Sequence, residues 1–227
     1  MEKHKYPRTK HLPWSRGRTD DDEILTRYDH LNNKEMVWTE KLDGENTTIY
    51  PGGICHARSM DSKDHPSRHW VKQLAARIGG DIPEGMRVCG ENPYAKHSIF
   101  YDKLPSYFLV FGIYNGDNCL CWDVTKEWAE LLGLEVVPEL FRATLPDIPA
   151  VHDQVFTGVS RVGGQLWDEE RNQPTGIPAQ EGYVVRLAAG FPSSDHQSCT
   201  AKFVRPHHVT TSDHWLNQPL VQNLLHS

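Results

Sequence analysis

The stretch Glu40-Lys41-Leu42-Asp43-Gly44-Glu45-Asn46 decides the fold, because it sets a lysine beside an Asp-Gly turn between two strand-forming runs. Residues 36–39 and 47–50 are rich in β-branched and aromatic side chains, which predicts a strand on each side. Because Asp-Gly between such runs is a hairpin-like signal, Lys41 is expected where a strand ends and the backbone bends. A lysine becomes nucleophilic once it loses its proton, and nearby cations or partial desolvation favour that loss. On this stretch alone, a nucleophile and a solvated turn lysine fit equally well.

The composition is that of a globular protein. The chain has 227 residues, 38% of them hydrophobic, which is enough to bury a core in one large domain or two small ones. No apolar run approaches the length of a membrane span, and the first residues lack the hydrophobic region of a signal peptide, so a cytoplasmic location is expected. Five cysteines without Cys-x-x-Cys spacing indicate reduced thiols, and the thirteen histidines form no zinc-binding quartet.

The net charge of −6 argues against a protein that coats nucleic acid non-specifically, but one segment is basic. Between residues 55 and 80, cations outnumber the two aspartates. These cations are Arg58, Lys63, Arg68, Lys72 and Arg77. They predict either a track for a phosphate chain or, as is commoner, a solvated helix face.

The rest of the chain predicts antiparallel strands separated by helices, which is the α+β class. Strands are expected at residues 54–58, 87–91, 106–114, 182–187 and 201–205. Helices are expected at 67–78, where apolar residues recur at fourfold spacing, at 124–132 behind an Asp123 cap, and within 148–162. Residues 163–180 are rich in turn-forming residues and predict a loop, and residues 6–22 predict an extended arm laid over the domain.

Polar residues recur where these strands begin or end. Arg58 and Glu91 end two strands, Glu181 precedes a third, and Lys202 lies in the last. Because alternate side chains of a strand share one face, these residues are expected to converge with Lys41 over one cleft. Two carboxylates, two further cations and a nucleophilic lysine suit a metal-bound nucleoside triphosphate, since carboxylates hold sugar hydroxyls and Mg²⁺ while cations balance phosphates.

Six short motifs follow one another between residues 40 and 205. They read Glu40-Lys41-Leu42-Asp43-Gly44-Glu45-Asn46, Ala57-Arg58-Ser59, Cys89-Gly90-Glu91-Asn92, the run 107–114, Glu181-Gly182-Tyr183-Val184-Val185-Arg186 and Ala201-Lys202-Phe203-Val204-Arg205. Their order resembles the covalent nucleotidyltransferase superfamily, in particular its ATP-dependent RNA ligases. Asn46 favours RNA, because DNA ligases and messenger-RNA capping enzymes usually carry arginine at that place. The resemblance implies a nucleotidyltransferase (ATP-grasp-like) core of antiparallel sheets flanked by helices.

The resemblance also implies a reaction that uses ATP with Mg²⁺ or Mn²⁺. Lys41 would attack the α-phosphorus of ATP, release pyrophosphate and leave a lysyl-AMP phosphoramidate. AMP would then pass to an RNA 5′-phosphate, and a 3′-hydroxyl would displace it to close the phosphodiester, with Asn46 positioning the end. Glu181 matches the carboxylate that organises the metal. Such a ligase would serve RNA repair, where a kinase or phosphatase partner can heal the ends first.

The remaining motif residues match nucleotide contacts of the family. Glu40 resembles the residue that reads the adenine amino edge, Phe111 matches the aromatic that stacks on adenine, and Glu91 matches the ribose-binding glutamate. Lys202 matches the lysine that neutralises the α-phosphate. Arg58 matches the arginine that contacts the ribose and later the 5′-phosphate end.

The last motif departs from the family pattern, which usually carries two lysines separated by one residue. Here Phe203 and Val204 follow Lys202, and Arg205 either shares the role or leaves the second cation absent. The predicted RNA contacts are Arg58, Lys63, Arg68, Lys72 and Arg205. Residues 206–227 are too few for the accessory domain that the family commonly carries. Residues 1–227 are therefore expected to form a single adenylyltransferase domain, with 1–35 as an arm and 206–227 as a short tail.

Each of these assignments has a structural alternative. Phe111 in an apolar strand suits the core, and Glu91 and Glu181 suit solvated strand ends. Three functions therefore stay open, namely an ATP-dependent RNA ligase, a DNA ligase or capping-type guanylyltransferase, and a nucleotide- or RNA-binding module without catalysis. The order of the motifs favours the first.

Overall fold

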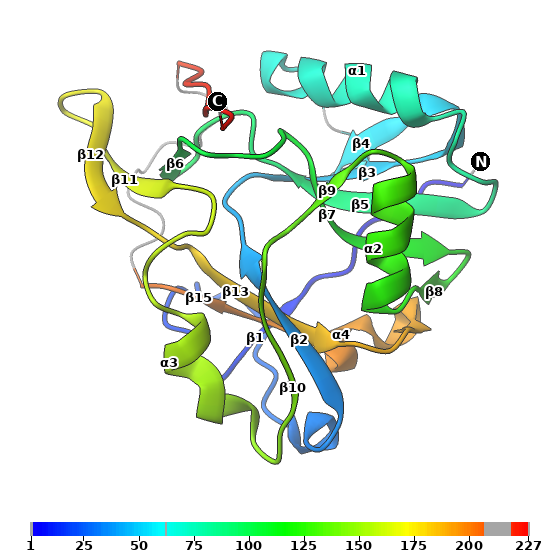
Figure 1. Cartoon of the computed structure of the whole chain (residues 1–227), viewed down its shortest axis with the longest axis vertical. Helices are drawn as coiled ribbons and strands as arrows, with labels where there is room; N and C mark the ends of the chain where they lie inside the picture. The colour runs from blue at the N-terminus through cyan, green and yellow to red at the C-terminus, as the bar shows by residue number, and fades with distance from the viewer. Residues whose placement is uncertain (1, 62, 207–218, 227) are drawn as a thin grey trace.

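Two large β-sheets form the body of the protein (Figure 1). The computed structural model of the chain describes residues 2–61, 63–206 and 219–226. In the first sheet, all neighbouring strands are antiparallel except β1, which runs parallel to β15. Its strands, in spatial order, are β1 (Lys10–His11), β15 (Thr200–Val204), β13 (Gly182–Leu187), β2 (Glu35–Lys41) and β10 (Glu139–Thr144).

The second sheet is built around a central antiparallel trio in which β3 pairs with β5 and β5 pairs with β7. Its order is β14 (Phe191–Pro192), β8 (Asn118–Cys119), β7 (Leu109–Asn115), β5 (Met86–Asn92), β3 (Glu45–Ile49) and β4 (Cys55–Ala57), with β9 (Glu135–Val136) parallel to β7. The mostly antiparallel sheets and the few helices confirm the α+β prediction.

Two helices, α1 (His69–Ile78) and α2 (Trp122–Leu131), pack against the second sheet. The predicted fourfold spacing is confirmed in α1, because Leu74 and Ile78 are buried in the same cluster as Val88 and Val110 of the sheet. The Asp123 cap is wrong, since Cys121 occupies the N-cap and the Asp123 carboxylate pairs with Arg142 instead. The helix expected within 148–162 is found at its start, as the 3-10 helix Ile148–Val151 that continues into the short α3 (His152–Val155). A further turn, α4 (His196–Cys199), precedes β15.

The loop expected at 163–180 is wrong. This segment forms the hairpin of β11 (Gly164–Asp168) and β12 (Gln173–Pro178), and β11 also pairs with β6 (Ile99–Tyr101) in a third sheet. Every residue of β12 is exposed. An exposed edge strand tolerates the prolines and glycine that make a strand hard to recognise in the sequence, because one side of its backbone bonds to water.

The expected hairpin at Asp43-Gly44 is also wrong, although Lys41 does end a strand as predicted. β2 pairs with β10 and β13 in the first sheet, whereas β3 pairs with β4 and β5 in the second. The Asp-Gly segment therefore carries the chain from one sheet to the other. Lys41 lies at this crossing, where the two sheets meet.

The segments at both ends of the described chain pack on this body. In the N-terminal arm, Leu12 is buried and the Trp14 indole N–H donates to Tyr183 Oη at 2.9 Å. In residues 219–226, the Asn223 side chain accepts a hydrogen bond from Tyr101 N and donates one to Pro93 O. Among the described residues, no helix is long and apolar enough to cross a membrane.

Candidate active site

A cavity of about 810 Å³ lies between the two large sheets. Its lining includes nine of the residues predicted for the site, namely Glu40, Lys41, Asn46, Arg58, Lys63, Arg68, Glu91, Phe111 and Lys202. They come from strands of both sheets and, for Arg58, Lys63 and Arg68, from the segment between β4 and α1, so the predicted convergence over one cleft is observed. Of the other predicted site residues, Lys72, Glu181 and Arg205 do not line this cavity, and Glu181 reaches the site through its ion pair with Lys41.

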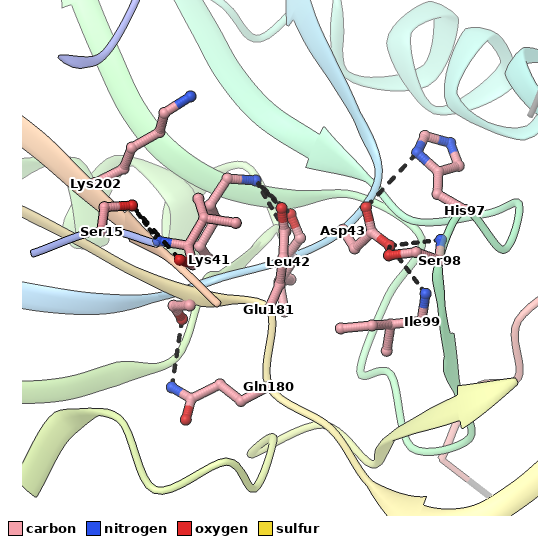
Figure 2. Close-up of polar contacts among 12 residues, drawn as sticks. Ser15, Lys41, Leu42, Asp43, His97, Ser98, Ile99, Gln180, Glu181 and Lys202 are labelled. Carbon is pink, nitrogen blue, oxygen red and sulfur yellow. Dashed lines mark hydrogen bonds and ion pairs between the residues drawn. The ribbon is translucent and has the colours of Figure 1, made fainter. Parts of the chain in front are cut away.

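Lys41 and Glu181 form the centre of the site. The Lys41 ammonium lies 2.8 Å from the Glu181 carboxylate, whose side chain is only 4% exposed (Figure 2). Burial lowers the pKa of Lys41, but the charges of Glu181, Glu91 and Asp43 outweigh it and raise that pKa above its ordinary value. In this site the nearby carboxylates outweigh the desolvation that was expected to favour proton loss from Lys41. They therefore favour its charged ammonium form.

The two carboxylates are suited to such a cation. Burial raises the pKa of Glu91 to about 8 and that of Glu181 to about 7, although Lys41 lowers both. A raised pKa means that the charged form of a carboxylate is disfavoured, and a nearby positive charge stabilises that form. Hard divalent cations such as Mg²⁺ and Mn²⁺ prefer oxygen ligands of this kind. No group of three His, Cys, Asp or Glu side chains in the described chain is arranged as a complete metal cage. The residues fit a hydrated ion held by one or two carboxylates and by substrate phosphates.

Asp43 fixes the backbone that presents Lys41. One oxygen of its carboxylate accepts three hydrogen bonds, from Ser98 N and Ser98 Oγ at 2.7 Å and from Ile99 N at 2.9 Å (Figure 2). Gly44 follows because the chain passes close to β5 there, and a Cβ at Gly44 would lie 2.7 Å from the carbonyl oxygen of Asn92. Asp43 is thus explained by the hydrogen bonds of its carboxylate to Ser98 and Ile99, and Gly44 by the close approach of the backbone of β5.

Two polar atoms in the lining, Glu40 Oε1 and Asn46 Oδ1, have no hydrogen-bond partner among the residues that the structure describes. Glu40 is 1% exposed, and its Oε2 accepts the Arg161 N–H at 2.8 Å while Oε1 is buried without a hydrogen bond. Burial raises the pKa of Glu40, although Ser160 and Arg161 act in the opposite direction. Asn46 Oδ1 is likewise buried without a partner in the described chain. Buried polar atoms of this kind are normally satisfied, so the cavity is built to receive a polar ligand.

Phe111 lies half-buried in the cavity wall, and a residue that the sequence did not indicate packs against it. The Tyr6 ring of the N-terminal arm meets the Phe111 ring edge-on, with 5.0 Å between centroids. Tyr6 also lines the cavity. No local sequence pattern indicated this contact, because it joins residues more than a hundred positions apart.

The predicted basic residues divide into two groups. Arg58 and Lys63 line the cavity, and Arg68 lines it while its Nε donates to Glu45 Oε2 at 2.7 Å. Burial, followed by the nearby Arg8, lowers the pKa of Arg58. Lys72 pairs with Asp64 on the exposed surface.

Arg205 differs from both groups. Its Nε and Nη2 atoms are buried without hydrogen-bond partners in the described chain, and it lies outside the cavity lining. Its position outside the lining therefore gives no support to the alternative in which Arg205 acts as a second phosphate-neutralising cation.

A sequence profile of RNA ligases matches residues 34–204. The chain belongs to the RNA ligase family. No curated protein sequence matches it. The family match confirms the resemblance on which the site residues were assigned, and it covers every strand that contributes a motif residue to the cavity.

Solved structures with a similar fold include Naegleria gruberi RNA ligase. A mutant of that enzyme with ATP and Mn has a TM-score of 0.51 and 17% identity, covering 85% of this chain and 57% of that chain. The same ligase with PPi has a TM-score of 0.48 and 18% identity, covering 78% and 51%. At this identity the likeness shows the fold alone, and the chain spans little more than half the length of these relatives.

Proposed function

We propose that this protein is an ATP-dependent RNA ligase that works through a lysyl-AMP intermediate on Lys41. The observation that carries the proposal is the Lys41 ammonium held 2.8 Å from the buried Glu181, in a cavity lined by the other motif residues of an RNA ligase family member. A solvated turn lysine would have no reason to pair with a carboxylate as buried as that of Glu181. A non-catalytic binding module would not need this pair either.

In the first step, the Lys41 nitrogen attacks the α-phosphorus of ATP. The N–P bond forms, the bond from the α-phosphorus to the bridging oxygen breaks, and pyrophosphate leaves with its electron pair. Lys41 must first give up its proton, since Glu181 and Glu91 hold it charged. A divalent cation held by Glu181 and Glu91 would supply the positive charge that balances the phosphates. With that positive charge beside Glu181, Lys41 would release its proton to solvent and present a neutral amine.

The cavity residues divide the recognition of ATP among themselves. Glu40, whose Oε1 is buried in the cavity wall, would meet the adenine amino edge, and the ring of Phe111 would stack on adenine. Lys202 and Arg58 bring two cations to the phosphate end of the same cavity. Preorganised cations of this kind stabilise the charge that develops during transfer.

In the later steps, AMP passes to an RNA 5′-phosphate and a 3′-hydroxyl displaces it. Arg58, Lys63 and Arg68 lie on the cavity wall where the RNA ends would enter, and Asn46 would position the end. We place Lys72 and Arg205 away from the reacting ends. Because sealing needs a 5′-phosphate and a 3′-hydroxyl, a kinase or phosphatase would supply them for broken RNA.

We further propose that residues 34–204 act with the arm and with residues 219–226 as one adenylyltransferase unit. The packing of Trp14 on Tyr183 and of Asn223 on Tyr101 supports this. The remainder of the expected tail, residues 207–218, lies outside the described residues. A cytoplasmic location is also proposed, and it is supported by the five free cysteines.

The test is a sealing assay on nicked duplexes with ATP and Mg²⁺. We expect joining of a nick with RNA on its 3′-hydroxyl side and little joining of an all-DNA nick. GTP or NAD should not replace ATP. Preference for the DNA nick would favour a DNA ligase, labelling by GTP would favour a capping-type enzyme, and binding of nucleotide without any covalent product would favour a binding module.

A further inference from the structure

The N-terminal arm brings two unassigned residues to Lys202. Strand β1 runs parallel to β15 in a register that places His11 beside Lys202. The arm then turns back, so that Asp22 Oδ1 lies 3.7 Å from Lys202 Nζ and 3.3 Å from His11 Nε2. Both residues precede the region that the RNA ligase profile matches.

The Asp22 carboxylate is held in place by its own turn. Its Oδ2 accepts hydrogen bonds from Thr19 N at 2.9 Å and from Thr19 Oγ1 at 3.1 Å. These bonds orient the carboxylate and leave Oδ1 to face Lys202 and His11. A carboxylate oriented in this way needs no reordering to meet a cation, which is the condition for an effective electrostatic partner.

His11 lies beside the same carboxylate, with its Nε2 3.3 Å from Asp22 Oδ1. It is 1% exposed, and its Nδ1 lies 2.7 Å from Ser15 Oγ, which in turn accepts the Val204 N–H at 2.9 Å. The Ser15 hydroxyl proton is therefore free for His11 Nδ1, because its other acceptor, Val204 O, is 3.5 Å away. With that proton donated to Nδ1, the imidazole proton would lie on Nε2, the nitrogen that is 3.3 Å from Asp22 Oδ1. Burial and then Lys202 lower the pKa of His11 to about 4, so His11 is neutral at neutral pH.

Lys202 needs such a partner, because its surroundings oppose its charge. Burial lowers the pKa of Lys202, and Lys41 and Arg58 lower it further, while Asp22 and Glu181 raise it. Glu181 is already engaged with Lys41 at 2.8 Å. Asp22 is thus the carboxylate that remains for Lys202.

We propose that Asp22 is a positioning residue for nucleotidyl transfer: oriented by Thr19 and His11, it holds the Lys202 ammonium charged at the cavity wall, aimed at the nucleotide phosphate. The inference rests on the proposed function. Asp22 itself touches no reacting atom and acts through Lys202.

The test compares Asp22→Asn with the wild-type protein. The amide keeps an oxygen for the Thr19 bonds while it removes the charge. Asp21→Asn is the matched control, because Asp21 is an exposed neighbour and its substitution removes the same formal charge. The rate of lysyl-AMP formation with ATP and Mg²⁺ is measured from about pH 6 to about pH 10. This range covers the titration of a lysine whose pKa is lowered.

We expect the alkaline fall in rate to move about one pH unit lower in Asp22→Asn, the ordinary effect of losing an opposite charge within contact range. Asp21→Asn should leave the profile unchanged. In the Lys202→Ala background, Asp22→Asn should cause no further loss of rate, because its effect runs through Lys202. An unchanged alkaline limb, or losses that multiply in the double variant, would overturn the proposal.

A second readout does not depend on catalysis. The titration of the Lys202 side chain is followed by NMR in selectively labelled protein, with Lys202→Arg used to assign the signal. We expect Lys202 to lose its proton at lower pH in Asp22→Asn, and an unshifted titration would overturn the inference. If the wild-type protein forms no lysyl-AMP at all, the proposed function fails, and this titration still decides whether Asp22 holds the Lys202 charge.

Discussion

Replacing Asp43 with alanine tests why the nucleophile is followed by Asp-Gly. The Asp43 carboxylate accepts two backbone N–H groups and one hydroxyl, from Ser98 and Ile99, and these bonds tie the Lys41 segment to the chain before β6. Alanine removes the acceptor but leaves both backbone donors in place. The Ser98 hydroxyl can rotate towards water, whereas the backbone groups cannot.

The size of the effect follows from those two donors. Each buried donor left without a partner costs about 1–3 kcal/mol, so we expect Asp43→Ala to lower the free energy of unfolding by roughly 4 kcal/mol. With a denaturant slope of about 3 kcal/mol per molar urea, the unfolding midpoint should fall by slightly more than 1 M. Ser98→Ala is the matched control. It removes one of the three bonds without stranding a backbone donor, so its cost should be near 1 kcal/mol.

The assay is equilibrium unfolding in urea, followed by lysyl-AMP formation on the fraction that remains folded. Folded Asp43→Ala should also form the intermediate slowly, because the backbone that presents Lys41 has lost its anchor. The reasoning is refuted if Asp43→Ala and Ser98→Ala destabilise the protein equally. It is also refuted if Asp43→Ala costs less than about 1 kcal/mol, the size of one ordinary hydrogen bond.

Three further predictions concern two residues proposed to act on the nucleotide and two buried histidines. Phe111→Leu should keep most of the apolar volume but lose the stacking face, so the apparent affinity for ATP should fall by roughly tenfold with little change in Tm. A lower Tm with an unchanged ATP dependence would show that Phe111 only packs in the core. Glu181→Ala should lose most lysyl-AMP formation at limiting Mg²⁺, with excess Mg²⁺ restoring little, and wild-type rates would refute its role. Burial lowers the pKa of His11 and of His196 to about 4, so the folded state binds fewer protons than the unfolded state between pH 6.5 and 4, and stability is lost as the pH falls through that range. Each histidine accounts for roughly 2 kcal/mol of that loss at pH 5. The unfolding free energy of His196→Gln should therefore drop less between pH 7 and pH 5 than that of the wild-type protein. An equal drop in the two proteins would contradict the assignment.

The sequence predicted the strands that carry the site because their signals are local. Lys41 ends a strand as the β-prone run before it indicated, and β13 has the bounds expected for residues 182–187. The α1 helix follows from apolar spacing within its own ten residues. Each of these features depends on neighbours along the chain, and neighbours are what a sequence pattern records.

The features that were missed depend on contacts between distant segments. The Asp-Gly turn looks like a hairpin turn, but sheet pairing sends β2 and β3 into different sheets. Strand β12 exists because β11 is available to pair with it, despite its prolines and glycine.

The candidate site divides in the same way. Motif residues such as Lys41 and Glu91, near strand ends, and Lys202, within the last strand, line one cavity as their positions along the strands predicted. The arm contributes Tyr6 and Asp22, and no spacing rule connects either of them to its partner. The charge state of Lys41 was also missed, because it depends on the buried Glu181, 140 positions further along the chain.

The central claim is that Lys41 is the nucleophile. The most direct measurement is peptide mapping by mass spectrometry after incubation with ATP and Mg²⁺, alongside Lys41→Ala and the control Lys34→Ala, whose lysine is exposed and precedes the same strand. We predict AMP on the peptide that contains Lys41 in the wild-type protein and in Lys34→Ala, and no AMP in Lys41→Ala. AMP on a different lysine, or undiminished labelling of Lys41→Ala, would contradict the account.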